Sequence, residues 1–156
     1  MKKYILKSLM LLVVALITVS CSDDETPVQT LDVIPVNLHG VWQLQESNGA
    51  ALPENVYVYI DFDRKGTYKL YQNNDSMYPR LITGKYEIEQ DYYLGAVISG
   101  VYDFEQGKWN NEYVVTDLLE SGSMIWTVKN GDEVSKYVRV EKVPQEITDQ
   151  VVDTQK

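Results

Sequence analysis

Apolar and polar residues alternate along the central part of the chain. In residues 55–63 every second position is apolar: Val56, Val58, Ile60 and Phe62. The positions between them carry tyrosine and aspartate. A period of two is typical of a β-strand that has one face buried and the other in water. The pattern therefore predicts an antiparallel sheet wetted on one side.

Seven further runs show the same period less sharply, so we expect eight strands. Their ranges are 40–47, 55–63, 67–72, 81–89, 94–101, 112–119, 123–129 and 134–142. Tight turns are predicted at Gly66, Gly122 and Asn130–Gly131, because these residues accept turn conformations. Eight short strands bury their edges best in an antiparallel up-and-down barrel, and a two-sheet β-sandwich is the alternative. The expected fold class is all-β.

The barrel domain is expected to span residues 38–143. Residues 21–37 are acidic and contain Pro27 and Pro35, a composition that favours a flexible tether. In the tail, residues 144–156, Ile147 lies four residues before Val151, which fits one face of a short helix. A frayed terminus is the alternative for that tail.

Residues 1–20 read as a signal peptide. Lys2 and Lys3 precede an apolar run from Leu9 to Val19. This run is only about half of the roughly 20 residues that a membrane-spanning helix needs. Cys21, the single cysteine of the chain, follows directly, and no intramolecular disulfide can form.

The segment Thr18–Cys21 resembles the lipobox of bacterial lipoproteins, although Thr18 stands where the family has an aliphatic residue. The resemblance implies that Cys21 carries acyl chains that attach the protein to a membrane. An ordinary secretory signal that leaves a free thiol is the alternative. Ser22–Glu25 resembles the export signal of Bacteroidetes lipoproteins, which implies an outer-membrane location facing the cell exterior. A solvated acidic linker is the other interpretation.

The chain is strongly acidic. Residues 1–20 contain three lysines and no acid, so their removal lowers the formal charge from −9 to −12. Such a surface repels phosphate, and no basic stripe offsets it. We therefore expect no nucleic-acid partner and little attraction to anionic lipids.

Gly40, Val41 and Trp42 resemble the Gly-x-Trp motif that opens the first strand of lipocalins. Arg139, on the last predicted strand, resembles the arginine that packs over that tryptophan. Together with residues 86–88 and 137–140, these positions make residues 38–143 similar to the lipocalin-like lipoprotein domains of Bacteroidetes. The resemblance implies structural roles for Gly40, Trp42 and Arg139.

Aromatic residues are the candidates for ligand binding. All but one of the twelve tyrosines and all three tryptophans lie after residue 20. Tyr57, Tyr59 and Trp109 are the residues that we expect to contact a small apolar or carbohydrate ligand, because aromatic faces stack on both. The alternatives are that tyrosine suits half-buried strands and that Trp109 plugs one end of the barrel.

No catalytic or metal-binding motif is present. His39 is the sole histidine, so neither a zinc site nor a catalytic triad is expected. The carboxylate pairs fall on predicted wet faces or turns, so we expect no enzyme and no cofactor. A non-enzymatic interaction protein, such as an accessory subunit of a surface complex or an inhibitor of a foreign enzyme, is the alternative function.

One loop position resembles a modification site. Asp75, Ser76 and Met77 resemble the acceptor motif for O-glycosylation in Bacteroidetes, which implies glycosylation of Ser76. A plain loop serine is the alternative.

Overall fold

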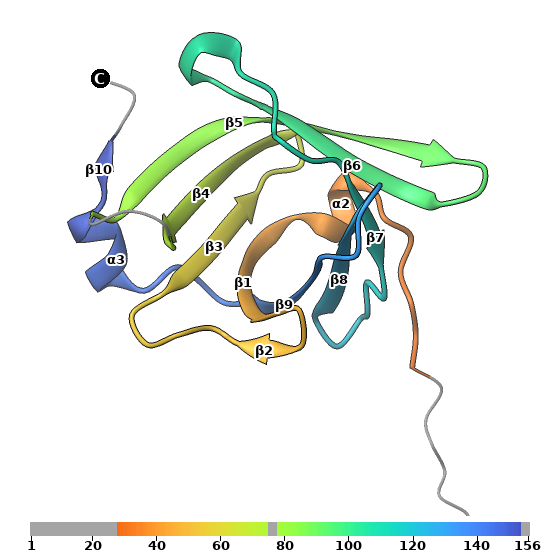
Figure 1. Ribbon diagram of the computed structural model, residues 1–156, viewed down its shortest axis with the longest axis horizontal. Coiled ribbons are helices and arrows are strands. Elements are labelled where there is room, and N and C mark those ends of the chain that lie inside the picture. Colours follow the sequence, from red (N-terminus) through yellow and green to blue (C-terminus); the bar gives the residue numbers. More distant parts are fainter. Residues whose placement is uncertain (1–27, 75–77, 154–156) are drawn as a thin grey trace, which may run out of the picture.

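The computed structural model describes residues 28–74 and 78–153, and these form a closed β-barrel (Figure 1). The barrel strands are β1 (Gly40–Ser47), β3 (Tyr57–Phe62), β4 (Thr67–Asn73), β5 (Arg80–Asp91), β6 (Gly95–Tyr102), β7 (Tyr113–Thr116), β8 (Ser123–Val128) and β9 (Val134–Val140). The remaining elements are α2 (Pro35–Leu38), β2 (Ala50–Ala51), the 3-10 helix η1 (Phe104–Gln106), α3 (Gln145–Gln150) and β10 (Val152–Asp153).

Each barrel strand pairs antiparallel with the next along the chain, and β9 returns to pair with β1. This closed ladder confirms the eight-stranded up-and-down barrel and rules out the sandwich. Two short strands lie outside the closed ladder, since β2 pairs with β1 and β10 runs parallel to β5. Strand β7 is shorter than the predicted strand over residues 112–119 because Asp117, at a φ of +49°, ends the extended backbone.

The β3–β4 hairpin shows how a local sequence sets the register of the barrel. The Asp63 carboxylate accepts hydrogen bonds from the backbone N–H groups of Lys65 (2.7 Å) and Thr67 (2.8 Å). Gly66 takes a φ of +87°, as predicted, which an L side chain rarely adopts. Tyr86 then ties β5 to this turn, because its hydroxyl donates to the Asp63 carbonyl at 2.7 Å.

An arginine–tryptophan contact holds the start of β1 against β9. Trp42 is fully buried, and its indole N–H donates to the Leu38 carbonyl at 2.7 Å. The Arg139 guanidinium lies over the Trp42 ring, with Cζ 4.4 Å from the ring centroid. It also donates to the backbone carbonyls of Asn37 and His39. This is the packing that the lipocalin resemblance implies.

Gly40 makes room for that contact. Its φ is +120°, and a Cβ atom there would lie 3.1 Å from Arg139 Nη1. A larger residue would therefore strain the backbone and press on the guanidinium at the same time.

The N-terminal segment closes one end of the barrel. Thr30 forms a β-bridge with Leu119, and α2 then inserts Leu38, which is fully buried, into the core. Residues 30–37 thus pack against the barrel, although composition predicts a flexible tether over residues 21–37. Backbone hydrogen bonds of Gln29 and Leu31 to the β7–β8 connection and the burial of Val33 and Leu38 hold this segment, and composition reveals neither.

The C-terminal helix α3 covers part of the outer surface of the barrel. Ile147 of α3 and Val143 before it pack against Tyr59 of β3, and all three are less than 10 % exposed. Of the two alternatives for the tail, the short helix is therefore correct for residues 145–150. The prediction that Tyr59 faces water is wrong, because α3 lies over it.

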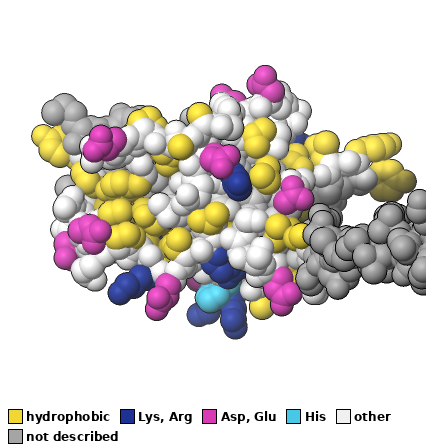
Figure 2. All heavy atoms as spheres, turned by 90° about the horizontal axis from the view of Figure 1, so that it is seen from below, with side chains coloured by type: hydrophobic (Ala, Val, Ile, Leu, Met, Phe, Trp, Pro, Cys, Tyr) yellow, Lys and Arg dark blue, Asp and Glu magenta, His cyan; other side chains and the backbone are white. Residues whose placement is uncertain are grey.

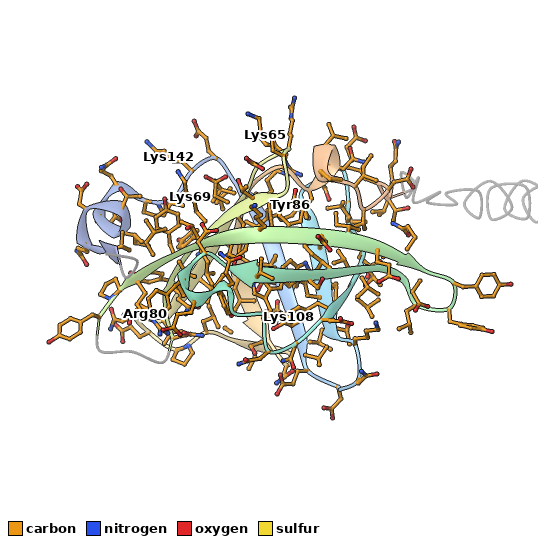
Figure 3. The ribbon with its side chains drawn as sticks, turned by 90° about the horizontal axis from the view of Figure 1, so that it is seen from above. Lys65, Lys69, Arg80, Tyr86, Lys108 and Lys142 are labelled. Carbon is orange, nitrogen blue, oxygen red and sulfur yellow. The ribbon has the colours of Figure 1, made fainter. Side chains whose placement is uncertain are left out.

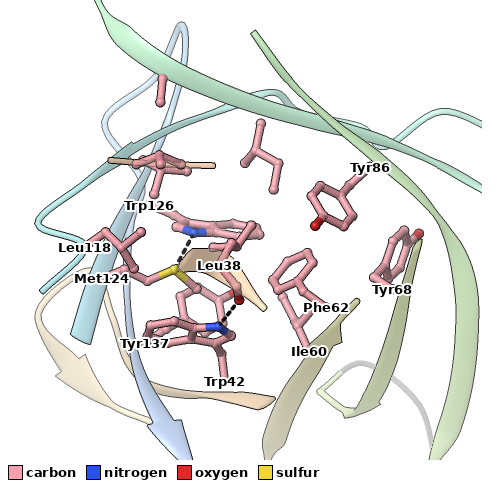
Figure 4. Packing of buried hydrophobic residues seen from close by; sticks show 14 of the residues in the cluster. Leu38, Trp42, Ile60, Phe62, Tyr68, Tyr86, Leu118, Met124, Trp126 and Tyr137 are labelled. Carbon is pink, nitrogen blue, oxygen red and sulfur yellow. Dashed lines mark hydrogen bonds between the residues drawn. The ribbon is translucent and has the colours of Figure 1, made fainter. Parts of the chain in front are cut away.

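The barrel interior is rich in aromatic contacts (Figure 4). Phe62 meets Tyr86 edge to face at a centroid distance of 4.9 Å, and Trp126 lies 5.0 Å from Tyr137. The Trp126 indole N–H donates to the sulfur of the buried Met124 at 3.3 Å. Such pairs contribute roughly 0.5–1.5 kcal/mol each beyond their buried area.

Arg139→Met tests the contact that closes the barrel. The variant keeps the apolar stem but loses the stacked charge and two hydrogen bonds, so we expect a loss of roughly 2–3 kcal/mol in the free energy of unfolding. Urea unfolding measures it. Lys136→Met, on the same strand, is the control: it breaks an exposed ion pair with Glu46 and should cost less than about 1 kcal/mol. Equal losses in the two variants would contradict the assignment.

Candidate functional site

A cavity of about 330 Å³ lies at the end of the barrel opposite α2. Its aromatic lining residues are Tyr68, Tyr102, Trp109, Tyr113, Trp126 and Tyr137. Its aliphatic lining residues are Leu44, Val58, Ile60 and Leu70, and its neutral polar ones are Ser47, Gln72, Asn74, Asn110, Asn111 and Ser135. The cavity is thus lined by aromatic rings together with amide and hydroxyl groups.

None of the described lining residues carries a charge at neutral pH, although charged residues make up 24 % of the chain. A charged ligand would therefore lose its hydration without gaining a counter-ion from these residues. The lining instead favours a ligand that is uncharged, with apolar faces for the rings and polar groups for the amides and hydroxyls.

Trp109 is fixed in the cavity wall by its neighbours. Its indole N–H donates to the Tyr68 hydroxyl at 2.8 Å, and the two rings meet edge to face at 5.2 Å. The Trp109 and Trp126 rings lie 6.1 Å apart, and Trp126 in turn lies 5.1 Å from Tyr113. The aromatic wall is therefore one connected set of rings that is already arranged before a ligand enters.

The absence of a side chain at Gly100 leaves the space that the Trp109 ring occupies. A Cβ atom at Gly100 would lie 2.4 Å from Trp109 Cε2, which is too close for any real contact. The Trp109 backbone N–H donates to the Gly100 carbonyl at 2.9 Å, so the loop continues the edge of β6. Strands β6 and β7 pair at only two positions, and the loop before β7 meets β6 again through a bridge between Lys108 and Val101. The other side of Trp109 lines a groove of about 350 Å³ on the outer surface.

Burial affects the ionisation of the tyrosines in the barrel. It raises the pKa of Tyr68 to about 12, while the hydrogen bond from Trp109 acts in the opposite direction. Burial likewise raises the pKa of Tyr86 to about 12, and the Asp63 charge adds to the rise. Both hydroxyls therefore stay protonated at neutral pH.

Of the three residues predicted to contact a ligand, the structure brings only Trp109 to the cavity. Tyr57 and Tyr59 lie on the outer face of β3, packed with the cluster that α3 covers. The inward face of β3 belongs to Val58 and Ile60, which line the cavity. Tyr57 and Tyr59 are thus separated from Trp109 by the wall of the barrel.

The cavity residues that sequence reasoning missed lie on inward-facing positions of other strands. Tyr68 pairs directly with the buried Phe62 across the β3–β4 hairpin, so the two side chains share a face. The predicted hairpin contained the signal that would have found Tyr68. Trp126 and Tyr137 carry no comparable signal, because the apolar residues Ile125 and Val138 stand next to them and the alternation does not show which face of the strand points inward.

Two predicted site residues, Cys21 and Ser76, lie outside the described residues. His39 is exposed at the start of β1. The described part of the chain contains no group of three or more histidine, cysteine or carboxylate side chains able to hold a metal ion. Within the same ranges, no helix has the length and apolar character needed to cross a membrane.

A closed up-and-down barrel with one end covered and a cavity at the other defines the class of lipocalin-like β-barrels. Comparison with known families agrees, since the model of the lipocalin-like domain family matches residues 38–126. The chain therefore belongs to the lipocalin-like domain family. The match extends from Leu38 to Trp126 in β8. No curated protein and no solved structure matches the chain.

The raised pKa values predict a loss of stability in alkaline solution. An unfolded tyrosine ionises near pH 10, whereas Tyr68 holds its proton to about pH 12, so the folded state binds more protons between these values. The contribution of the protonated Tyr68 to stability should be fully present below pH 10 and be lost as the pH rises towards 12. Urea unfolding across this range measures the slope. Tyr68→Phe should show a smaller slope, and a slope equal to that of the wild type would contradict the burial of this hydroxyl.

Proposed function

We propose that the chain is a lipid-anchored surface lipoprotein whose barrel binds a small uncharged ligand, apolar or carbohydrate, at its open end. The observation that carries the binding role is the cavity of about 330 Å³, walled by aromatic rings and free of charge among its described lining residues. Ligand pockets typically have volumes of about 300–1,000 Å³. This cavity lies at the small end of that range, which favours a ligand of one or two rings.

The chemistry of the lining supports both ligand classes. Trp109, Trp126 and Tyr113 offer ring faces for a sugar or a flat apolar molecule. Asn110, Asn111 and the other neutral polar groups offer donors and acceptors for hydroxyls. The described lining has no carboxylate and no histidine, so the proposal is a binding role and not a catalytic one.

Ligand binding is tested with two probes, an uncharged naphthylamine dye and the neutral two-ring sugar maltose. We expect the wild type to bind at least one of them. Trp109→Ala should weaken that binding about tenfold, because it removes a stacking surface worth about 1–2 kcal/mol. Ser135→Trp, which fills the cavity from β9, should abolish it. Titration calorimetry measures both effects.

The matched control is Tyr59→Phe. It changes an aromatic residue on the outer face of β3 and should bind like the wild type. If neither probe binds the wild type, or if Trp109→Ala binds as tightly as the wild type, the cavity is not the ligand site.

The lipid anchor rests on the sequence around Cys21. Labelling growing cells with a fatty-acid probe should mark the wild-type protein, because the lipobox resemblance implies acylation of this residue. Cys21→Ser should lose the label and leave the membrane fraction. An unlabelled wild type, or a labelled Cys21→Ser variant, would contradict the anchor without bearing on the cavity.

A further inference from the structure

The exposed large hydrophobic side chains gather at one end of the molecule. The described residues include eight of them, and six lie in two segments. These six are Val28, Ile34 and Val36 of the N-terminal segment and Tyr92, Tyr93 and Leu94 of the β5–β6 turn. Exposed apolar residues that gather at one end of a molecule mark an interaction site more often than scattered single residues do.

The β5–β6 turn is the tip of a projecting hairpin (Figure 3). The pairing of β5 with β4 ends at Lys85, but its pairing with β6 continues to Asp91. In Figure 3, Arg80 marks the start of β5 and Tyr86 its middle, and the strand then runs on past the body of the barrel. The tip is therefore held away from the rest of the barrel.

The aromatic pair at the tip is exposed yet held in place. Tyr92 is 92 % exposed and Tyr93 89 %, and their rings contact each other edge to face at 4.9 Å. The Asp91 carboxylate accepts hydrogen bonds from the backbone N–H groups of Tyr93 (2.8 Å) and Leu94 (2.9 Å). Gly95 completes the turn with a φ of +81°. A partner that contacts this tip therefore meets apolar groups whose backbone is already ordered.

The tip and the N-terminal segment lie at the same end of the barrel. Strand β5 starts beside Gln72 at the cavity and runs away from it to Asp91. The N-terminal segment bridges to Leu119 beyond the far end of β7, away from the cavity. Figures 1 and 3 show both segments on one side, and Figure 2 shows hydrophobic side chains at that projecting end.

We propose that this end of the barrel is a membrane-contacting surface, with Tyr92, Tyr93 and Leu94 entering the headgroup layer of the bilayer. The inference rests on the lipid anchor at Cys21 described under the proposed function. Val28 follows Cys21 by seven positions, and a chain of this length spans at most about 25 Å. The anchor therefore holds the adjacent end of the barrel, and with it the hairpin tip, close to the bilayer.

The side chains fit this partner. Tyrosine is enriched at membrane–water interfaces because its ring enters the apolar layer while its hydroxyl stays hydrated. Glu89 and Asp91 precede the tip on β5, so zwitterionic headgroups suit it better than anionic ones. In this orientation the cavity opens away from the membrane.

The test uses the mature chain, residues 22–156, which contains every described element and no cysteine. An N-terminal histidine tag tethers it to phosphatidylcholine vesicles that contain a nickel-chelating lipid, so that the tag replaces the acyl anchor. An environment-sensitive dye is attached to Gln90→Cys beside the tip or, as a control, to Glu54→Cys, an exposed position before β3 at the cavity end. The dye at the tip should shift to the blue on the vesicles, and the dye at the control position should not.

In a second experiment the two tyrosines of the tip, Tyr92 and Tyr93, are replaced. Tyr92→Ser with Tyr93→Ser should reduce the fraction of dye in the lipid environment at least about fivefold, because both rings leave the interface. Tyr78→Ser, which changes an exposed tyrosine before β5 at the cavity end, should leave it unchanged. Thermal unfolding checks that each variant is folded.

Two results would overturn the proposal. If the dye at the tip stays in water on tethered vesicles, the tip does not contact the membrane. The exposed tyrosines would then be a contact surface for a protein partner. An undiminished blue shift in the double variant would show that other residues make the contact. Because the tag supplies the tether, failure of the acyl anchor at Cys21 in cells is a separate result from failure of the tip on vesicles.

Discussion

Closure of the barrel depends on the contact between Arg139 and Trp42. The first and last strands of an up-and-down barrel are neighbours that no connecting segment links directly, so side-chain contacts help to fix their register. A cation stacked on a buried indole does this, and the same guanidinium holds the carbonyls of Asn37 and His39. One side chain thus joins β9, β1 and the segment that closes the end of the barrel.

This arrangement explains why the cavity lies at only one end. Around Trp42 the interior is filled by Leu38 and Met124, both fully buried. At the other end, β1 and β9 contribute the small residues Ser47 and Ser135, which line the cavity and leave space between the aromatic walls. The distribution of side-chain volume along the barrel axis therefore decides where a ligand can enter.

The alternation of apolar residues was sufficient to predict the strands, because every barrel strand has one face in the interior. The turn at Gly66 and the short helix around Ile147 also carried local signals. What the sequence did not reveal was which tyrosines face the cavity. Which face of a strand points inward depends on the pairing register. The burial of an outward-facing residue such as Tyr59 depends on the distant helix α3, which covers it. Trp109 was found because a tryptophan in a polar loop has no obvious place in the core.

The position of the three tryptophans has a spectroscopic consequence. Trp109 and Trp126 line the cavity, whereas Trp42 lies beneath Arg139 at the closed end. A molecule that enters the barrel changes the surroundings of two indoles and leaves the third as an internal reference. The intrinsic fluorescence of the unmodified protein therefore distinguishes occupancy of the cavity from a change in the packing at its closed end.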